Sequence, residues 1–496
     1  MEGSSAGSAG PAGAWRPGIK GFGAPRWNTQ SIKRNLFKGG LGSVTWGKRT
    51  TCWLLLAVVV SFLSANSEAQ STLTLLAGNQ NPEVIGRAVA EFEAAHPELR
   101  VDLVLEAWNT VDDKFTVMVS SGTAPDVFIN NSVYGWARYA YQGLFTDLEP
   151  FIERDRESLR WNEFFGPAIE QARIAGKLYG MPTGPAMGFG TTYNADLLNE
   201  AGLAPPPTSW TDPSWNWDVM VDYAKKLTRI DGEGRATRYG VDFWDADGNL
   251  LAVAYAFGGD WFDEASYAQG IVNQVRLDSL ENARAYQAAA DLRMVHQVRP
   301  GGPVGGVDGG VASFSAGHIG MWLEISMFRQ TNPQAMEFTW GFAPYPFSRE
   351  SDRRRIASWG GGGFAAIPAH ASNKEGAWAF LKWVATASRE ENPGLRDWHP
   401  VGGPRQTWLE AMSAWHEIGV SSQTPDQMFE VLMGAVERAV ALPRQTIAGG
   451  TEVWEVLSRA LVPALRGETP VSAALVNAQA LATAAVAEFK QSLLDE

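Results

Sequence analysis

Cysteine is almost absent from this 496-residue chain, in which Cys52 is the single one. The residues that follow it can therefore form no disulfide, offer no thiol nucleophile and build no cysteine-based zinc site. Histidine is also scarce, and its six scattered residues show no metal-ligand spacing. We expect neither a metal nor a cofactor.

Common catalytic and phosphate-binding motifs are missing from residues 70–496 as well, since G-x-S-x-G, H-E-x-x-H and G-x-x-x-x-G-K-[ST] do not occur there. Gly360-x-Gly362-x-x-Ala365 has dinucleotide-motif spacing, but Phe364–Ile367 has the composition of a strand where that motif needs a helix. Asp245-x-Asp247-x-Asn249 starts like a calcium loop. Leu250 and Ala256 replace its glycine and its bidentate glutamate, so a turn is predicted. These absences favour a protein that is not an enzyme.

Positive charge is in short supply. Residues 1–69 hold eight of the 41 basic and two of the 54 acidic residues, which leaves 33 and 52, a net charge of −19, for residues 70–496. Such a chain is a poor nucleic-acid binder. Its length indicates more than one domain, and 45% apolar residues suffice for a large core.

Long apolar runs are also rare, and the clearest one, Trp53–Leu63, is too short to span a bilayer comfortably. Lys48-Arg49 precedes it and Ser67-Glu68-Ala69 follows it, which is the order of a secretory signal peptide over residues 48–69. We predict cleavage after Ala69. Cys52 stands before the run rather than after it, so no lipid anchor is expected. A soluble periplasmic protein of a Gram-negative bacterium follows.

The residues before this signal, 1–47, form an N-terminal extension. Residues 1–43 are rich in Gly, Ser, Ala and Arg without apolar periodicity, which predicts disorder or an over-long reading frame that truly starts at Val44. Ser31–Lys38 resembles a twin-arginine signal with Lys for the first Arg, but it lies far from the apolar run. The export route stays open.

The exported part begins with a βαβ pattern that predicts a parallel sheet. Strands are expected at Leu73–Ala77, Val101–Leu105 and Asp126–Ile129, with helices between them. Ligands of open α/β sheets bind outside the carboxyl ends of the strands. The polar and aromatic residues that follow these strands should share one rim: Asn79, Gln80, Trp108, Asn130 and Asn131.

The stretch Gly176–Trp210 reads GKLYGMPTGPAMGFGTTYNADLLNEAGLAPPPTSW. Pro182 and Pro185 exclude helix and predict a rigid crossing segment. A strand at Thr191–Tyr193 and a short helix from Ala195 follow, before three prolines end the helix. This order resembles the hinge-crossing segment of the family 1 extracellular solute-binding proteins, the class that includes maltose-binding protein.

Further blocks resemble the same family, in the family's order, over nearly all of residues 71–385. They are SSGTAPDVF (120–128), Gly143-Leu144 with Leu148, Lys225–Thr228, Tyr239–Val241, Gly258-Gly259, Val311–Met321, Trp340–Pro346, Trp359–Pro368 and Ser372–Leu381. The resemblance implies an α/β, two-lobe periplasmic-binding-protein fold of type II, maltose-binding-protein-like, with three hinge crossings near 182–186, 321–325 and 357–361. Lobe 1 is expected at 70–183 plus 325–357, and lobe 2 at 187–320 plus 360–496.

Tryptophan is abundant, with 21 residues, several of them beside glycine or at expected strand ends. A sugar ring has an apolar C–H face and an edge of hydroxyls, so its site needs flat aromatics together with polar side chains. Besides the rim residues, we nominate Asp126 and Tyr134 in the first lobe, where Asp126 either caps the rim or contacts ligand. The other candidates are Trp244, Asp245, Trp261, Trp322, Glu324, Trp359, Gly361 and Arg405.

The resemblance implies a monomeric carrier whose lobes close over a carbohydrate and deliver it to the transmembrane subunits of an ABC permease with their ATPase. The first-lobe candidates depart from those of maltose-binding protein, so maltose itself is not predicted. Two alternatives stay open. One is a binder of a polyamine, a glycerophosphodiester or an iron chelate on the same fold, although the nominated rims are mainly neutral. The other is a secreted carbohydrate-active enzyme.

Overall fold

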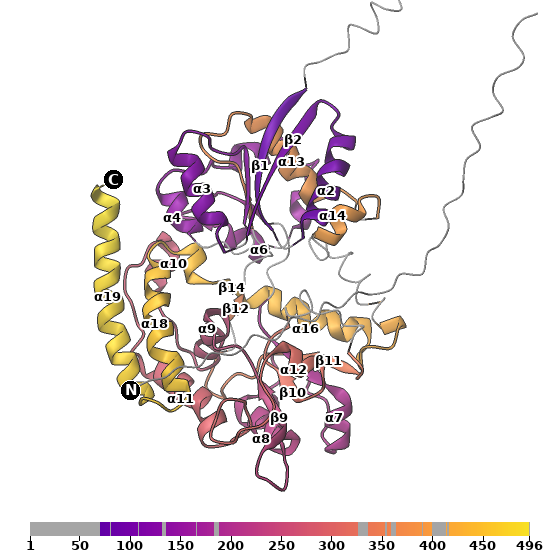
Figure 1. The fold of residues 1–496 in the computed structure, drawn as a ribbon, viewed down its shortest axis with the longest axis vertical. Helices are drawn as coiled ribbons and strands as arrows, with labels where there is room; N and C mark the ends of the chain where they lie inside the picture. The colour runs from indigo at the N-terminus through magenta and orange to yellow at the C-terminus, as the bar shows by residue number, and fades with distance from the viewer. Residues whose placement is uncertain are drawn as a thin grey trace, which may run out of the picture. The chain divides into compact units, whose positions relative to one another are not determined.

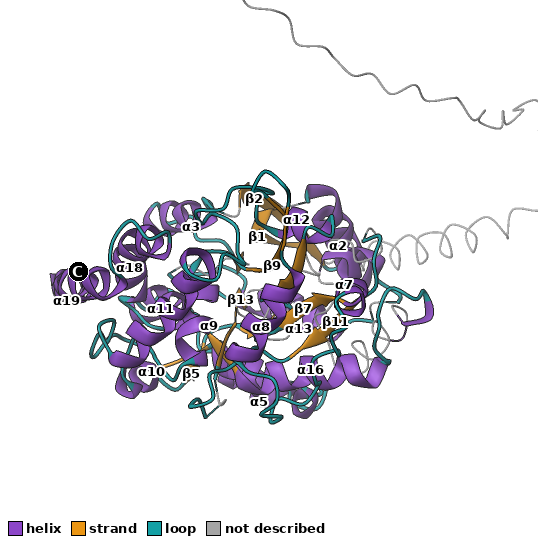
Figure 2. Ribbon diagram, turned by 90° about the horizontal axis from the view of Figure 1, so that it is seen from below, coloured by secondary structure: helices purple, strands orange, loops and turns teal. Residues whose placement is uncertain are grey.

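Two five-stranded sheets, each with its own hydrophobic core, carry the fold (Figures 1 and 2). Both lie within the unit Glu68–Glu496. The computed structural model describes residues 70–79, 81–107, 109–130, 135–164, 166–182, 188–325, 336–352, 355–358, 364–388, 390–398, 413 and 416–495.

The first sheet contains the predicted βαβ units. Its strands, in spatial order, are β2 (Leu99–Ala107), β1 (Ser71–Asn79), β3 (Val127–Asn130), β13 (Phe364–Ala366) and β6 (Met181–Pro182). Strands β1, β2 and β3 are parallel, and β13 runs antiparallel to both β3 and β6. Helices α2 (Pro82–Ala95) and α3 (Val111–Ser120) connect the parallel strands. Asn81 caps α2 by accepting the amide of Val84, and Pro82 occupies its first turn.

The other elements of the first core come from two distant parts of the sequence. They are α4 (Trp136–Tyr141), α5 (Glu149–Asp155), η1 (Trp161–Glu163), α6 (Gly166–Gln171), the hairpin of β4 (Arg173–Ile174) and β5 (Lys177–Leu178), α13 (Lys374–Thr386) and α14 (Pro393–Trp398). Helix α13 buries Trp378, Phe380 and Leu381 in this core, and α14 buries Leu395. Figure 1 shows α13 and α14 beside α2 and β1.

The second sheet is mixed. Its spatial order is β11 (Trp340–Ala343), β7 (Thr191–Asn194), β10 (Ile319–Trp322), β9 (Ala236–Asp242) and β8 (Arg229–Ile230). Strands β9 and β10 are parallel, whereas β7 is antiparallel to β10 and β11. A separate ribbon pairs β12 (Ile356–Ser358) with β14 (Ala439–Ala441).

Helices surround this sheet. They are α7 (Ala195–Glu200), α8 (Trp217–Leu227), α9 (Asp247–Ala256), α10 (Glu264–Gln269), α11 (Leu280–Met294), α12 (Val311–Ser315), α16 (Pro425–Arg438), α17 (Pro443–Thr446), α18 (Gly450–Leu465) and α19 (Val471–Asp495). Helix α8 has an apolar period, with Val221, Ala224 and Leu227 buried and Asn216 as its cap. Helix α9 is buried along Leu250–Ala256, a stretch rich in aliphatic residues.

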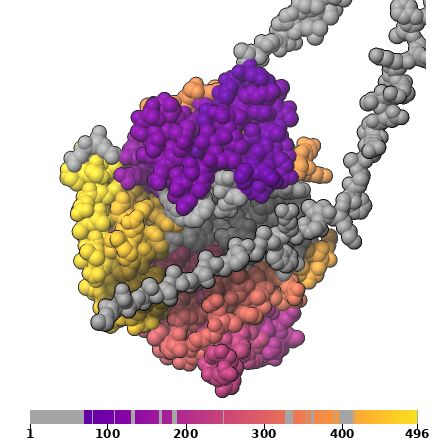
Figure 3. All heavy atoms as spheres, in the orientation of Figure 1, coloured from indigo at the N-terminus to yellow at the C-terminus, as the bar shows by residue number. Residues whose placement is uncertain are grey.

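The C-terminal helix α19 contacts both cores. Residues from Val471 to Val486 on its buried face lie in the second core, and Phe489 lies in the first. Figure 3 shows α18 and α19 in yellow along one side of the molecule. Among the described residues, the segment Val471–Leu494 is the one helix long and apolar enough to cross a membrane by length and composition.

Two expected lobe boundaries are corrected by the strand pairing. Residues 325–357 were expected in the first lobe, but β11 pairs with β7 in the second sheet, and all four of its residues are buried there. Residues 360–496 were expected in the second lobe, but β13 pairs with β3 and β6 in the first sheet. Strands β11 and β13 are short and buried, so their composition alone does not tell which sheet each of them joins.

The positions at which the chain crosses between the two sheets also differ from those expected. The chain passes from the first sheet to the second between Pro182 and Thr191, as predicted. No crossing occurs at 321–325, since β10 and β11 belong to the same sheet. The chain returns to the first sheet between β12 and β13, and passes back to the second core between α14 and α16.

Candidate functional site

The parallel strands of the first sheet end at one edge. Asn79 of β1 is opposite Ala107 of β2, and Asn130 of β3 is opposite Phe364 of β13. The backbone therefore brings Asn79 and Asn130 to the rim that the sequence predicted. Six other nominated residues and one glycine lie outside the described residues: Gln80, Trp108, Asn131, Tyr134, Trp359, Gly361 and Arg405.

A corresponding edge exists in the second sheet. Trp322, the last residue of β10, is opposite Asp242, the last residue of the parallel strand β9. Trp244 and Asp245 follow β9, and Glu324 follows β10, so the carboxyl ends of these strands bring three nominated residues together. Thr192 of β7 holds the backbone after β10 in place, because its Oγ1 donates to the carbonyl oxygen of Glu324 at 2.8 Å.

Of the nominated tryptophans that the structure describes, Trp244 is partly exposed to solvent, whereas Trp261 and Trp322 are buried. Its ring meets that of Trp322 edge to face, with 5.3 Å between the centroids and 81° between the planes. This geometry is a favourable one for aromatic pairs. Trp322 is fully buried, so core packing holds its ring in place, and the contact with it orients the Trp244 ring.

The structure corrects the expectation of direct stacking for Trp322 and Trp261. Trp261 is 1% exposed, its Nε1 donates to the Tyr286 hydroxyl at 2.6 Å, and its ring stacks on Trp454 at 5.8 Å. Both tryptophans are packing residues in this structure. The sequence could not distinguish these two tryptophans from Trp244. All three stand at the end of, or just after, a segment that is rich in β-forming residues or flanked by glycine.

Asp245 belongs to a buried charge network rather than to an open surface. Its carboxylate pairs with Arg293 of α11 at 2.8 Å and with Arg299 at 3.0 Å. Arg299 also pairs with Asp242 at 2.9 Å, and its guanidinium lies 3.5 Å from the centroid of the Phe243 ring. Burial opposes ionisation of Asp245, but Arg299 and Arg293 outweigh it, and its pKa lies below the usual value. The network fixes the segment that carries Trp244.

Asp126 has a structural position. It precedes β3, at the end of the sheet opposite the rim, and is 3% exposed. Its carboxylate accepts the amide of Thr74 at 2.8 Å, the amide of Asn373 at 2.7 Å and the Ser372 hydroxyl at 2.9 Å. Asp126 thus bonds to backbone amides, as one of its two predicted roles has it, but at the end of the sheet opposite the rim that it was expected to hold.

Glu324 is 0% exposed, so its side chain forms no part of the surface in this structure. Asn249, which sequence analysis assigned to a turn, instead lies in the first turn of α9, shortly after Trp244. It is also 0% exposed, and within the described part of the chain neither atom of its amide has a hydrogen-bond partner. Asp247-Gly248-Asn249 before a purely apolar run was the available signal of a helix N-terminus.

Comparison with known proteins places this geometry in a family. The sequence profile of the bacterial extracellular solute-binding proteins matches residues 77–390. A lactose-binding protein of Rhizobium radiobacter is 21% identical over 339 residues, which cover 66% of this chain and 73% of that protein.

Solved structures agree in fold. The sugar-binding protein MalE from Xanthomonas citri superposes with a TM-score of 0.66 at 18% identity, over 86% of this chain and 100% of that one. An ABC substrate-binding protein from Listeria monocytogenes, in complex with cycloalternan, gives 0.63 at 20% identity, over 84% and 98%. The predicted two-lobe, maltose-binding-protein-like α/β fold is thereby confirmed.

Proposed function

The chain belongs to the bacterial extracellular solute-binding protein family, and from this premise we propose that it captures a carbohydrate between the carboxyl edges of its two sheets. The observation that carries the proposal is Trp244, a partly exposed indole held edge to face by a buried tryptophan at the end of the second sheet. A flat aromatic at this edge matches the apolar face of a sugar ring. A relative named as a lactose-binding protein and a structural neighbour in complex with cycloalternan support the same ligand class.

The charge at this edge supports a neutral ligand. Asp245 lies beside Trp244 but is already neutralised by two guanidinium groups. A polyamine would need carboxylates that are available to it, and a phosphodiester would need available arginines. The polar contacts to the sugar hydroxyls are assigned in this proposal to Asn79, Gln80, Asn130, Asn131, Tyr134, Gly361 and Arg405, with Trp108 and Trp359 as further stacking surfaces.

Two lobes divide the site. We assign residues 70–182 and 364–398 to the first lobe, and residues 188–358 and 416–495 to the second. Three connections join them, and rotation about such connections closes binding proteins over ligand. A carbohydrate shifts the population towards the closed form only through its preference for that form. The closed form then delivers the sugar to an ABC permease and its ATPase.

The family is extracellular, and the proposal includes export as a soluble periplasmic protein with cleavage near Ala69. The basic pair Lys48-Arg49, the apolar run and the small residues before Gln70 support this assignment. The first described strand begins at Ser71, directly after the proposed cleavage point.

A thermal-shift screen tests the proposed function. The purified protein is heated with mono- and oligosaccharides, polyols, polyamines and glycerophosphodiesters. Because a ligand that binds only the folded state stabilises it by RT ln(1 + [L]/Kd), a hundredfold excess over Kd adds about 2.7 kcal/mol. We expect one carbohydrate class to raise the midpoint. Trp244→Ala should weaken its binding at least about tenfold, because truncation of an aromatic hot spot typically costs about 2 kcal/mol or more and about 1.4 kcal/mol is tenfold.

The matched control is Trp454→Ala. Trp454 is also partly buried and also stacks on a buried tryptophan, but it lies on α18 rather than at the sheet edge. This variant should lose stability and keep the affinity for the sugar. A shift with a charged solute and with no carbohydrate would refute the carbohydrate assignment.

A further inference from the structure

One side of α11 turns away from the second core and forms an exposed stripe. Leu280, Arg284, Gln287 and Asp291 follow one another at helical spacing, and Val295 at the C-cap continues the line. Leu280 is 60% exposed and Val295 is 65% exposed. The opposite side of the helix buries Ala285, Tyr286, Ala289 and Leu292, so α11 cannot rotate to hide these two apolar side chains.

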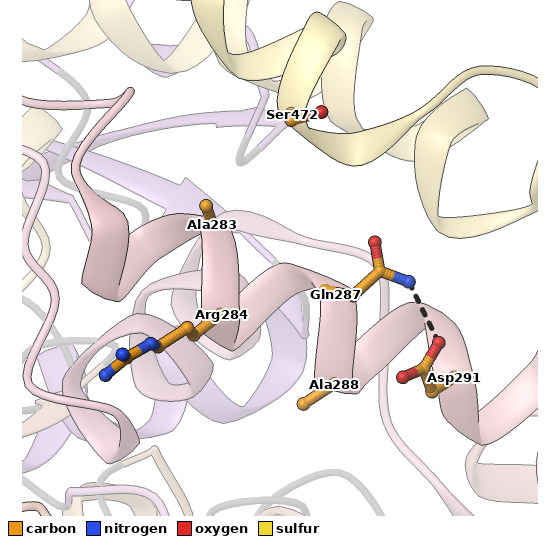
Figure 4. A pocket seen from close by; sticks show the side chains of 6 residues that line it. All are labelled: Ala283, Arg284, Gln287, Ala288, Asp291 and Ser472. Carbon is orange, nitrogen blue, oxygen red and sulfur yellow. Dashed lines mark hydrogen bonds between the residues drawn. The ribbon is translucent and has the colours of Figure 1, made fainter.

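A groove runs between α11 and the start of α19 (Figure 4). Its volume is about 410 Å³, and its lining is Ala283, Arg284, Gln287, Ala288, Asp291 and Ser472. Gln287 donates to the Asp291 carboxylate at 2.9 Å. Arg284 pairs with Glu350 at 3.2 Å, but both side chains are mostly exposed, and such pairs contribute little and exchange partners easily.

The flank of the groove is apolar and uncharged. Val476 on α19 is 62% exposed, and Ala473 and Ala480 beside it are exposed as well. From Val471 through Ala487, α19 contains no charged residue. On a chain whose residues 70–496 have a net charge of −19, this is a surface that another negatively charged molecule can approach with little repulsion.

The α11 stripe is complementary to itself. In an antiparallel pair of α11 helices centred between Gln287 and Ala288, Arg284 of each copy is opposite Asp291 of the other. The same register places Leu280 opposite Val295, so the two most exposed apolar side chains of the stripe cover each other. With a two-fold axis between the copies, the Arg284–Asp291 pair and the Leu280–Val295 pair each occur twice. An isologous interface requires this symmetry.

We propose that a second copy of this chain occupies the groove, through α11 packed antiparallel on α11 with the uncharged side of α19 alongside, so that the carrier is a dimer and not the monomer that the resemblance implied. The observed pattern favours a second copy over an unrelated protein, because the stripe contains its own cation, its own anion and its own apolar pair in two-fold order. One pair of helices alone buries less than the roughly 1,000 Å² that a specific interface needs, so Val476 and its neighbours on α19 must contribute.

Sedimentation equilibrium of the purified protein over a range of concentrations tests this. We expect a reversible dimer whose dissociation constant increases at least tenfold in Arg284→Asp and in Asp291→Arg, because each change places two like charges opposite each other. The combined variant R284D/D291R restores the opposite charges and should recover most of the dimer. Val476→Asp, which buries a charge at the interface, should also dissociate it.

The matched control is Arg154→Asp. Arg154 of α5 also forms an exposed ion pair, with Glu375 of α13 at 3.0 Å, and the substitution makes the same change of charge beside the first core, away from the stripe. It should leave the dimer unchanged. Thermal unfolding and sugar binding, measured on every variant, confirm that the monomer is intact. A protein that stays monomeric at all concentrations overturns the proposal, and so does a dimer that the swaps leave unaffected or that R284D/D291R fails to recover.

Discussion

At the residue scale, buried polar groups hold the two edges in place. Asp126 ties β1 to the start of α13, and Asp245 ties the segment after β9 to α11. Asp245 was nominated as a ligand contact, and Asp126 as either a support of the rim or a ligand contact, because the hydroxyl edge of a sugar needs polar side chains. Their neighbours in space, Asn373 and Arg293, lie far away in the sequence, so the sequence could not reveal that the carboxylates are engaged.

The network around Asp245 predicts a pH-dependent loss of stability. Asp245→Asn leaves Arg293 and Arg299 buried with one carboxylate between them, and breaking a buried pair typically costs about 3–5 kcal/mol. Because the folded-state pKa of Asp245 is lowered, its carboxylate stabilises the fold above the unfolded pKa, and this contribution disappears as the pH falls through the folded value.

Urea unfolding at several pH values between 7 and 3 measures this effect. The difference in free energy of unfolding between wild type and D245N should be largest near pH 7 and shrink below about pH 4. Asp218→Asn, which removes an exposed carboxylate, is the control and should change the stability little. A D245N deficit that stays constant down to pH 3 would contradict the assignment of Asp245 to the network.

At the scale of elements, α19 shows why composition alone is ambiguous. Its apolar length would allow a membrane span, yet one side of it packs on α18 and α11 through Leu475, Ala478 and Ala482. The structure therefore makes α19 a packed helix of the fold. Its N-terminal half belongs to the second core, whereas Phe489 lies in the first, where it contacts Arg138 of α4 at 5.5 Å.

Two leucines of α19 provide a matched test of this packing. Leu475 is 1% exposed, and Leu481 is 53% exposed. Leu475→Ala should lower the free energy of unfolding by about 2–5 kcal/mol, since it opens a cavity in the second core. Leu481→Ala should change it by about 0.5 kcal/mol or less. Chemical denaturation measures both values, and equal effects would mean that α19 is not docked as described.

For the whole molecule, the sequence predicted the parts with strong local signals. The βαβ units have clear periodicity and the crossing at Pro182 has helix-breaking residues, and both are confirmed. The return path was predicted incorrectly because β11 and β13 are buried strands of three or four residues. Their sheet is chosen by pairing with β7 and with β3, which no local pattern encodes.

The site was predictable to the same extent. Strand order places Asn79, Asn130 and Trp244 at carboxyl ends, as the sequence indicated, and also Glu324, which was expected at a crossing. Burial then separates the partly exposed Trp244 from Trp261 and Trp322, and the sequence contains no sign of that difference. Residues such as Trp108 and Trp359 stay predictions.

The measurement that tests the central claim most directly is hydrogen–deuterium exchange of the purified protein with and without the carbohydrate that binds it. Capture between the two edges predicts that sugar slows exchange in peptides that cover residues 77–82, 127–135 and 243–250, while peptides from the outer helix α8 stay unchanged. Protection at only one edge, or at sites away from both, would contradict capture of a carbohydrate between the two sheets.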